Sequence, residues 1–193
     1  MLTKTELIDF EKDIAAEFEA GHIQAPCHLH GGNEEALIGI FAGIQAGDWV
    51  FSTHRSHYHA LLKGIPQEVV KRAIMAGNSI SLQFPDYHFY TSAIVGGIVP
   101  IALGVAMTGQ RCWVFVGDMA ATTGIYSECL RYAEGHNLPI RFVVEDNGMS
   151  VDTPTQEAWG IARNPFSHAQ CKNRFYRYER TFPHQGSGVY VVF

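Results

Sequence analysis

Short apolar runs alternate with amphipathic segments along this chain, a pattern that predicts an α/β fold. Residues 49–53, 112–116 and 140–144 are the runs that resemble strands. Between the last two runs, residues 124–137 carry apolar side chains at helical spacing and predict a crossover helix. Because parallel neighbours need a connection of about a dozen residues or more, this unit predicts two adjacent parallel strands.

Capping signals predict two helices before the first strand. Thr3 and Glu6 form a capping-box pattern, and apolar residues at helical spacing continue from there to Gly21. Asn33 is the expected N-cap of the second helix, which has glutamates in its first turn and is expected to end at Gly47.

The remaining segments are predicted from proline, glycine and apolar content. Pro66 stands where a first helical turn accepts proline, and Gly77 closes that helix. Residues 77–92 are expected to be an irregular loop. Residues 94–109 are apolar and rich in small side chains, which predicts a helix that is either a core helix or an intersubunit one. Residues 188–193 are expected to form a final strand.

Two polar residues follow neighbouring predicted strands. Asp118 comes just after one run, and Asn147 follows 29 positions later, behind the next. Ligands of open α/β sheets bind beyond the carboxyl ends of the strands, so both side chains are expected in one crevice. A carboxylate and an amide oxygen suit a hard cation such as Mg²⁺, which leaves room for phosphate oxygens. The alternative for Asp118 alone is a helix cap.

Composition limits the classes of partner. The chain has 193 residues, 47% of them hydrophobic, and a net charge of −5, which argues against nucleic acid or an anionic membrane surface. No apolar run approaches the roughly 20 residues of a membrane span. The charged amphipathic N-terminus does not have the form of a signal peptide. Four cysteines without CxxC spacing favour reduced thiols in a cytoplasmic protein.

Several motifs stand in the order of a known family. Gly117-Asp118 and Asp146-Asn147 match in position a Gly-Asp-Gly motif and an Asn-Asn motif. The other matching segments are Cys27–Ala36, His54–His57, and Ala93–Gly96 with Val99-Pro100. Over residues 23–158 the chain thus resembles the alpha subunit of thiamine-diphosphate-dependent 2-oxo acid dehydrogenases, the decarboxylating component. The resemblance implies a three-layer α/β/α thiamine-diphosphate-binding fold with a mostly parallel sheet.

The resemblance also implies a site for thiamine diphosphate and Mg²⁺. Asp118, the Asn147 side-chain oxygen and the backbone carbonyl of Met149 would be the metal ligands. Arg55 would contact the diphosphate, since guanidinium pairs bidentately with phosphate; a surface arginine is the alternative. The further positions that match cofactor contacts are His54, Ala93, Val95, Met119 and Ala120.

The chain is rich in histidine, with ten residues. His28 and His57 match family histidines near the reacting carbon and are the predicted catalytic residues, because imidazole titrates near neutral pH. A zinc cluster is the alternative, drawn from His28, His30, His54, His57 and His59. The spacing offers that cluster neither a ligand pair on one helix face nor a CxxC partner.

Four positions depart from the family pattern. Met119 and Ala93 replace glycines, His54 replaces a tyrosine, and Asp146 replaces the first asparagine. If the position of Met119 required a positive φ, a methionine there would be strained. The extra carboxylate of Asp146 adds negative charge near the predicted metal.

Residues 1–193 are expected to form a single thiamine-diphosphate-binding domain, in which 159–193 is a divergent basic segment. Its cationic residues are Arg163, Lys172, Arg174, Arg177 and Arg180. They indicate either an acidic partner or phosphorylated substrate, or simply a solvated basic face. Compared with the family, the chain is interpreted as shortened at its C-terminus, without the downstream loop that bears another active-site histidine.

The family's activity is the oxidative decarboxylation of a 2-oxo acid with acyl transfer, often to a lipoyl-bearing acyltransferase. In the family, a beta subunit supplies the glutamate that activates the aminopyrimidine ring, and no motif here replaces it. The resemblance therefore implies an active site shared with a beta-type subunit, in a homodimer or an α2β2 heterotetramer. The alternatives are the diphosphate-binding half of a split transketolase-like enzyme and a non-catalytic homologue.

Overall fold

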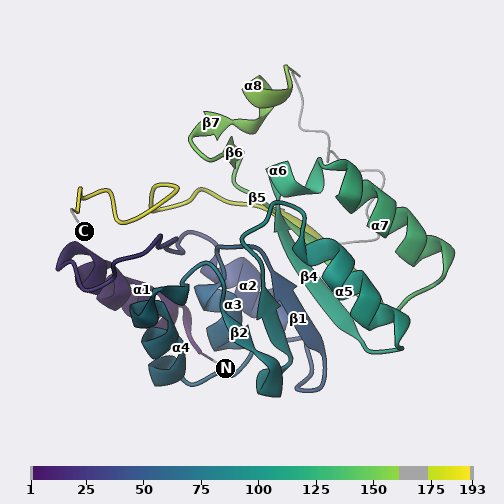
Figure 1. The fold of residues 1–193 in the computed structure, drawn as a ribbon, viewed down its shortest axis with the longest axis horizontal. Coiled ribbons are helices and arrows are strands. Elements are labelled where there is room, and N and C mark those ends of the chain that lie inside the picture. The colour runs from purple at the N-terminus through teal and green to yellow at the C-terminus, as the bar shows by residue number, and fades with distance from the viewer. Residues whose placement is uncertain (1, 161–173, 192–193) are drawn as a thin grey trace.

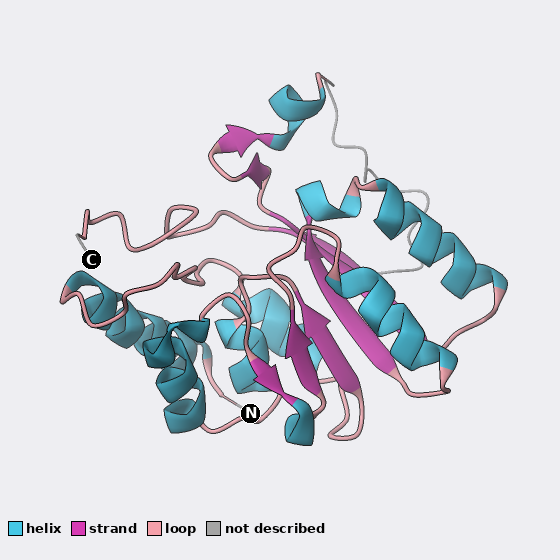
Figure 2. Ribbon diagram, in the orientation of Figure 1, coloured by secondary structure: helices cyan, strands magenta, loops and turns pink. Residues whose placement is uncertain are grey.

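A six-stranded sheet crosses the computed structural model, which describes residues 2–160 and 174–191 (Figures 1 and 2). Its strands are β1 (Trp49–Ser52), β2 (Gln83–Phe84), β3 (Phe89–Thr91), β4 (Cys112–Gly117), β5 (Ile140–Asp146) and β8 (Arg174–Arg177). The order is β2-β3-β1-β4-β5-β8, and every pair is parallel except β2 with β3. The expectation of a mostly parallel sheet is confirmed.

Helices cover both faces of this sheet (Figure 1). One layer holds α1 (Lys4–Glu19), α2 (Glu34–Phe41), α3 (His57–Leu62) and α4 (Gln67–Ala73), followed by a π-helical turn at Ile74–Asn78. The other holds α5 (Ile98–Met107), α6 (Asp118–Ala121) and α7 (Gly124–Gly135). A short antiparallel hairpin of β6 (Met149–Ser150) and β7 (Thr153–Pro154) precedes α8 (Thr155–Trp159), and a 3₁₀ turn spans Pro85–Tyr87. The arrangement is the expected three-layer α/β/α fold.

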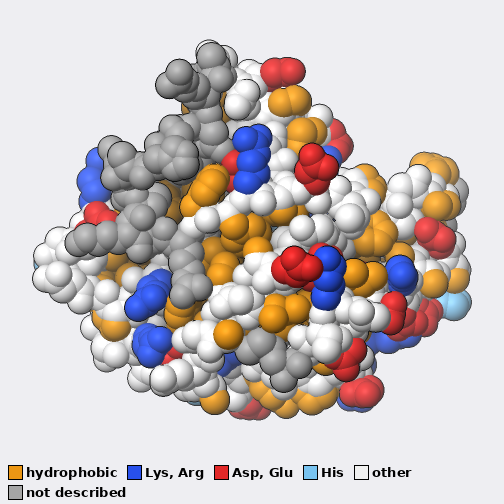
Figure 3. Space-filling model, turned by 180° about the vertical axis from the view of Figure 1, so that it is seen from behind, with side chains coloured by type: hydrophobic (Ala, Val, Ile, Leu, Met, Phe, Trp, Pro, Cys, Tyr) orange, Lys and Arg blue, Asp and Glu red, His pale blue; other side chains and the backbone are white. Residues whose placement is uncertain are grey.

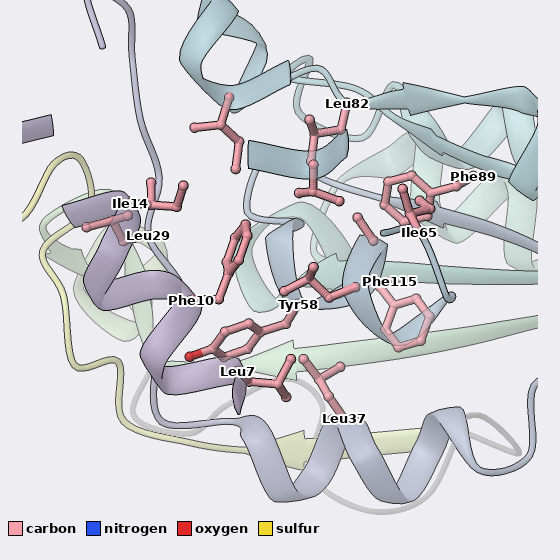
Figure 4. Close-up of a cluster of buried hydrophobic side chains, with 14 of the residues drawn as sticks. Leu7, Phe10, Ile14, Leu29, Leu37, Tyr58, Ile65, Leu82, Phe89 and Phe115 are labelled. Atoms are coloured by element: carbon pink, nitrogen blue, oxygen red, sulfur yellow. The ribbon is translucent and has the colours of Figure 1, made fainter. Parts of the chain in front are cut away.

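The two hydrophobic cores share the central strands, whose successive side chains point to opposite faces. Trp113 and Phe115 of β4 join the core beneath α1 to α4, part of which Figure 4 shows around Leu7, Phe10 and Tyr58. Val114 and its neighbours two residues away on β4 join the core beneath α5 and α7. Strands buried on both faces read as continuous apolar runs, which is why the sequence revealed them.

The register of β4 with β5 brings their ends together. Cys112 pairs with Ile140, and Gly117 pairs with Glu145. The next residues along each strand therefore emerge at one edge of the sheet, as the spacing of Asp118 and Asn147 predicted. The crossover between them is α7, which occupies the predicted segment.

Both predicted N-caps are in the expected positions, but only one of them works as a cap. Thr3 Oγ1 accepts the Glu6 N–H at 3.3 Å, and the Thr3 N–H donates to Glu6 Oε2 at 2.7 Å, which completes the capping box. Asn33 precedes α2 without capping it: its side-chain oxygen lies 3.4 Å from His30 Nδ1, and its amide donates to the Tyr176 hydroxyl at 3.0 Å. The predicted end of this helix at Gly47 is wrong, since α2 ends at Phe41.

Two loop and strand predictions are also wrong. Residues 77–92 are not an irregular loop, because they contain β2 and β3. β3 has only three residues and follows a turn that begins at Pro85, so its sequence is too short to show the pattern of a strand. Residues 188–191 form no strand, and 192–193 lie outside the described residues. The sixth strand is β8, in a segment that is more polar than the other parallel strands. Of the predicted basic residues, Arg163 and Lys172 lie outside the described part of the chain.

The surface seen from behind carries intermixed acidic and basic side chains with hydrophobic ones between them (Figure 3). Over the described ranges, the helices are too short or too polar to cross a bilayer. Cys27, Cys112 and Cys129 are buried free thiols, as the spacing of the cysteines indicated, and Cys171 lies outside the described residues.

Replacing Thr3 with alanine removes the capping box at α1, so we expect the free energy of unfolding to fall by about 1 kcal/mol. Thr5→Ala is the matched control, because Thr5 is equally exposed but lies inside the helix. Urea denaturation of both variants measures the difference. Equal destabilisation by the two substitutions would contradict a stabilising role for the cap.

Candidate functional site

A cavity of about 280 Å³ lies beyond the carboxyl ends of β4 and β5. All the predicted site residues except His57 line it: His28, His54, Arg55, Ala93, Val95, Asp118, Met119, Ala120, Asn147 and Met149. The segments that carry them are far apart in the sequence. The sheet brings them together because its parallel strands end at this edge.

Asp118 begins α6 directly after β4 and is 2% exposed. Its Oδ2 accepts the hydroxyl of Thr155 at 2.5 Å. The Thr155 N–H donates to the Gly148 carbonyl at 2.9 Å, so the β6–β7 hairpin folds back and positions this hydroxyl. Burial raises the pKa of Asp118, and the Thr155 hydrogen bond opposes that shift. The carboxylate is thus buried and held from one side.

Asn147 follows β5 with its amide orientation fixed. Its Oδ1 accepts the Met149 N–H at 2.9 Å, while its Nδ2 donates to the Tyr178 hydroxyl at 3.4 Å. An amide oxygen has two lone pairs, so Oδ1 can accept this bond and still bind a cation. Asp146, which adds charge here, is engaged elsewhere: its Oδ1 accepts the Gly148 N–H at 2.8 Å.

Met119 lies in α6, and its φ is not positive, so its backbone carries no left-handed strain. The methionine therefore fits the backbone at the position where the family has glycine. Ala120 follows it and is buried.

Arg55 is 8% exposed, which rules out the alternative of a surface arginine. Its guanidinium donates to the Leu29 carbonyl and, at 3.2 Å, to the His184 carbonyl. It therefore ties the loop before α2 to the C-terminal segment while it lines the cavity.

The C-terminal segment crosses this loop closely. A Cβ at Gly32 would lie 1.9 Å from the Glu179 carbonyl oxygen, and Gly32 has φ +93. Only glycine fits both the backbone conformation and the approach. Arg180 extends the contact to the hairpin, donating to the Val151 carbonyl and to Asp152 Oδ1, each at 2.8 Å.

His57 lies outside the cavity and is fully buried. Its Nδ1 is 2.9 Å from Glu11 Oε1, and its Nε2 is 2.9 Å from Ser79 Oγ. Ser79 Oγ also accepts the backbone N–H of His28 at 3.2 Å. His57 therefore contacts the backbone of His28 indirectly, through the Ser79 hydroxyl, from the side of the core. His30 and His59, which the alternative zinc cluster included, are buried core residues that do not line the cavity.

A third histidine joins His28 and His54 at the cavity. The ring of His184 lies 4.6 Å from that of His28 and 5.6 Å from that of His54, measured between centroids. Burial lowers the pKa of His28 to about 3 and that of His54 to about 4, so both rings are neutral at physiological pH. Burial and the Arg55 charge also lower the pKa of His184.

The sequence did not identify several residues that complete the cavity. They are Glu145, Thr155, Tyr178, Arg180 and His184. Tyr178, Arg180 and His184 depend on β8, which was not predicted, and Thr155 is positioned by the hairpin turn. Glu145 was readable as a polar residue near the end of β5, just before Asp146-Asn147. Its Oε1 accepts the Tyr176 hydroxyl, and lies 3.3 Å from His59 Nε2.

A mostly parallel sheet with a cavity beyond its strand ends, where charged and polar side chains converge, is the arrangement of α/β proteins that bind ligands at this edge. The family model described as "Dehydrogenase E1 component" matches residues 3–170, and the chain belongs to this family.

Three curated relatives are similar over most of this chain. The subunits alpha of acetoin:2,6-dichlorophenolindophenol oxidoreductase from Cupriavidus necator and Bacillus subtilis are each 31% identical to it, over 75% and 79% of this chain and 48% and 51% of theirs. The pyruvate dehydrogenase E1 component subunit alpha of Rickettsia felis is 28% identical over 81% of this chain and 51% of its own. The chain thus spans about half the length of these relatives.

The low pKa of His28 makes stability depend on pH. Between about pH 6.5 and 3, the unfolded state binds a proton at this position that the folded state does not, so the free energy of unfolding falls as the pH falls. One such group contributes a slope of at most about 1.4 kcal/mol per pH unit. His28→Asn should flatten the dependence, and urea denaturation from pH 7 to 4 measures it. The control is His136→Asn, at an exposed histidine that ends α7; identical slopes in all three proteins would contradict the shift.

Proposed function

We propose that this chain is the alpha-type subunit of a 2-oxo acid dehydrogenase-like enzyme that uses thiamine diphosphate and Mg²⁺. The observation that carries the proposal is the convergence of Asp118 and Asn147, from adjacent strand ends, in one cavity that Arg55 also lines. A buried carboxylate and an oriented amide oxygen are ligands that Mg²⁺ takes readily. Membership of the dehydrogenase E1 component family supports the same conclusion.

The residues present fit the cofactor. Asp118 Oδ1, Asn147 Oδ1 and the Met149 carbonyl would hold the Mg²⁺, and Arg55 would face the diphosphate. Ala93 and Val95, both exposed at the cavity wall, would contact the aminopyrimidine ring, with His54, Met119 and Ala120 completing the contacts. Thiamine diphosphate supplies a nucleophilic carbon and then accepts electrons as CO₂ leaves.

The histidines would orient the donor substrate and move protons. His28 and His184 are neutral, so each donates one N–H and accepts at its other nitrogen. His28 directs Nδ1–H to the His184 carbonyl at 2.5 Å, which leaves Nε2 as its proton acceptor. His57 acts on this group through Ser79 and is a positioning residue. His184, on the C-terminal segment, would be a third histidine beside the donor substrate.

The activity requires a second chain in this proposal. Glu145 and Asp118 are the described carboxylates lining the cavity, and Glu145 is engaged by the Tyr176 hydroxyl. Neither is free to activate an aminopyrimidine ring. A beta-type subunit would supply that glutamate within an α2β2 assembly, and a lipoyl-bearing acyltransferase would accept the acyl group.

A ketol is the second candidate substrate. Two of the relatives are named for acetoin, a 2-hydroxy ketone, and they are slightly more similar to this chain than the relative named for pyruvate. The nucleophilic carbon that the cofactor would supply suits the carbonyl carbon of both substrates. They differ in the leaving group, which is CO₂ for a 2-oxo acid and an aldehyde for a ketol. Product analysis with pyruvate and with acetoin distinguishes them.

Asp118→Ala should abolish the Mg²⁺-dependent binding of thiamine diphosphate, because it removes the charged ligand. Calorimetric titration of the chain, alone and with its beta-type partner, measures the affinity. Asp86→Ala is the matched control, since Asp86 is an exposed aspartate on the turn before β3. Absence of binding in the unsubstituted protein with its partner would refute the proposed function. Unchanged affinity in Asp118→Ala would refute the metal assignment.

Thr155→Val should weaken Mg²⁺ binding by about 10- to 100-fold, the usual effect of removing a group that orients a metal ligand. Thr155→Ser keeps the hydroxyl and should restore most of the affinity. Thr153→Val, on the exposed side of the same hairpin, is the control. A Mn²⁺ titration followed by electron paramagnetic resonance reports the affinity. If the valine and serine variants bind equally, Thr155 does not orient Asp118.

A further inference from the structure

We propose that His28, His54 and His184 form a binding site for a divalent transition-metal ion such as Zn²⁺. One ring nitrogen from each lies within 4.8 Å of the others. The three residues come from the loop before α2, the loop after β1 and the C-terminal segment. This site is separate from the oxygen ligands at Asp118 and Asn147, and it does not depend on the proposed function.

The hydrogen bonding of His28 prepares it as a ligand. A backbone carbonyl only accepts, so the bond from His28 Nδ1 to the His184 carbonyl fixes the proton on Nδ1 and the lone pair on Nε2. Histidines that bind metals usually donate their other N–H to a carbonyl or carboxylate in this way. The contact orients the ring before any ion arrives.

The other two rings are free to adjust. Within the described ranges, neither the His54 nor the His184 ring makes a hydrogen bond, although each stacks edge-on against His28. Zn–N bonds of 2.0–2.1 Å place tetrahedral ligands about 3.4 Å apart, so the rings must close by roughly an ångström. Rotation about the side-chain bonds of His54 and His184 is the movement that the proposal requires.

The donor set selects the kind of ion. Three imidazoles with an open fourth position form the ligand set of several zinc sites, whereas Mg²⁺ prefers oxygen. The rings are neutral at pH 7, the form in which imidazole binds metals. The Arg55 charge nearby opposes a cation and should keep binding reversible. A bound ion would occupy the cavity and exclude a substrate from His28.

Calorimetric titration of the protein without cofactor, in excess Mg²⁺, tests the site with Zn²⁺ as the probe. We expect one ion per chain, and visible absorption of Co²⁺ should report the nitrogen ligands. His184→Ala removes one ligand but keeps the carbonyl that binds Arg55 and His28, so the fold is preserved. It should weaken Zn²⁺ binding by more than about tenfold, given that losing even an outer partner of a metal ligand has that effect.

His136→Ala is the control, because His136 is exposed at the end of α7 and remote from the cavity. Asp118→Ala should bind Zn²⁺ as tightly as the unsubstituted protein, which separates this site from the Mg²⁺ site. The proposal is overturned if the protein takes up no Zn²⁺ in excess Mg²⁺, or if His184→Ala binds it with unchanged affinity. Either result leaves the thiamine diphosphate titration to be judged on its own.

Discussion

The parallel pairing of β4 with β5 is the constraint on which the cavity depends. Their shared register ends both strands at one level, and the residues that follow supply the buried carboxylate and the oriented amide. β4 is apolar on both faces because each face is covered by helices. If β5 were paired with β4 two residues out of register, the same faces would stay buried. Asp118 and Asn147 would however be displaced along the strands by about 7 Å relative to each other, since each strand residue rises about 3.3 Å. The register of this strand pair, and not only the alternation of its buried faces, therefore fixes the geometry of the site.

A series of hydrogen bonds connects α1, in the helical layer that holds α1 to α4, with the wall of the cavity. Glu11 in α1 bonds His57, which bonds Ser79, whose hydroxyl accepts the His28 N–H. Every member is buried, and an unpaired member would cost free energy in such surroundings. The chain of bonds links a helix far from the cavity to the position of an imidazole at its wall.

The sequence predicted the parts of the site that depend on strong local patterns. Asp118 and Asn147 follow long apolar strands, so their proximity was readable from spacing alone. His57 matched a family position, yet α3 turns it into the core, where Glu11 and Ser79 bind it. Spacing along a short helix cannot tell which histidine faces a cavity formed by distant segments.

The position of the C-terminal segment, from β8 onward, could not be predicted from the sequence for a different reason. β8 is a four-residue strand with arginine at both ends, and its partner β5 supplies the pairing that stabilises it. Tertiary context therefore determines this strand, and local propensity does not. With β8 unpredicted, Tyr178, Arg180 and His184 had no place near the cavity, although the close approach at Gly32 requires the segment to lie there.

The two carbonyls that Arg55 binds also bear on the order of assembly. Leu29 is 26 positions away in the chain and His184 is 129 positions away. Contacts of such long sequence separation close only after much chain entropy is lost, so they form late in folding. The backbone amides of the cavity histidines, His28, His54 and His184, should therefore exchange their hydrogens well before those of β4 and β5, while the rest of the molecule remains folded.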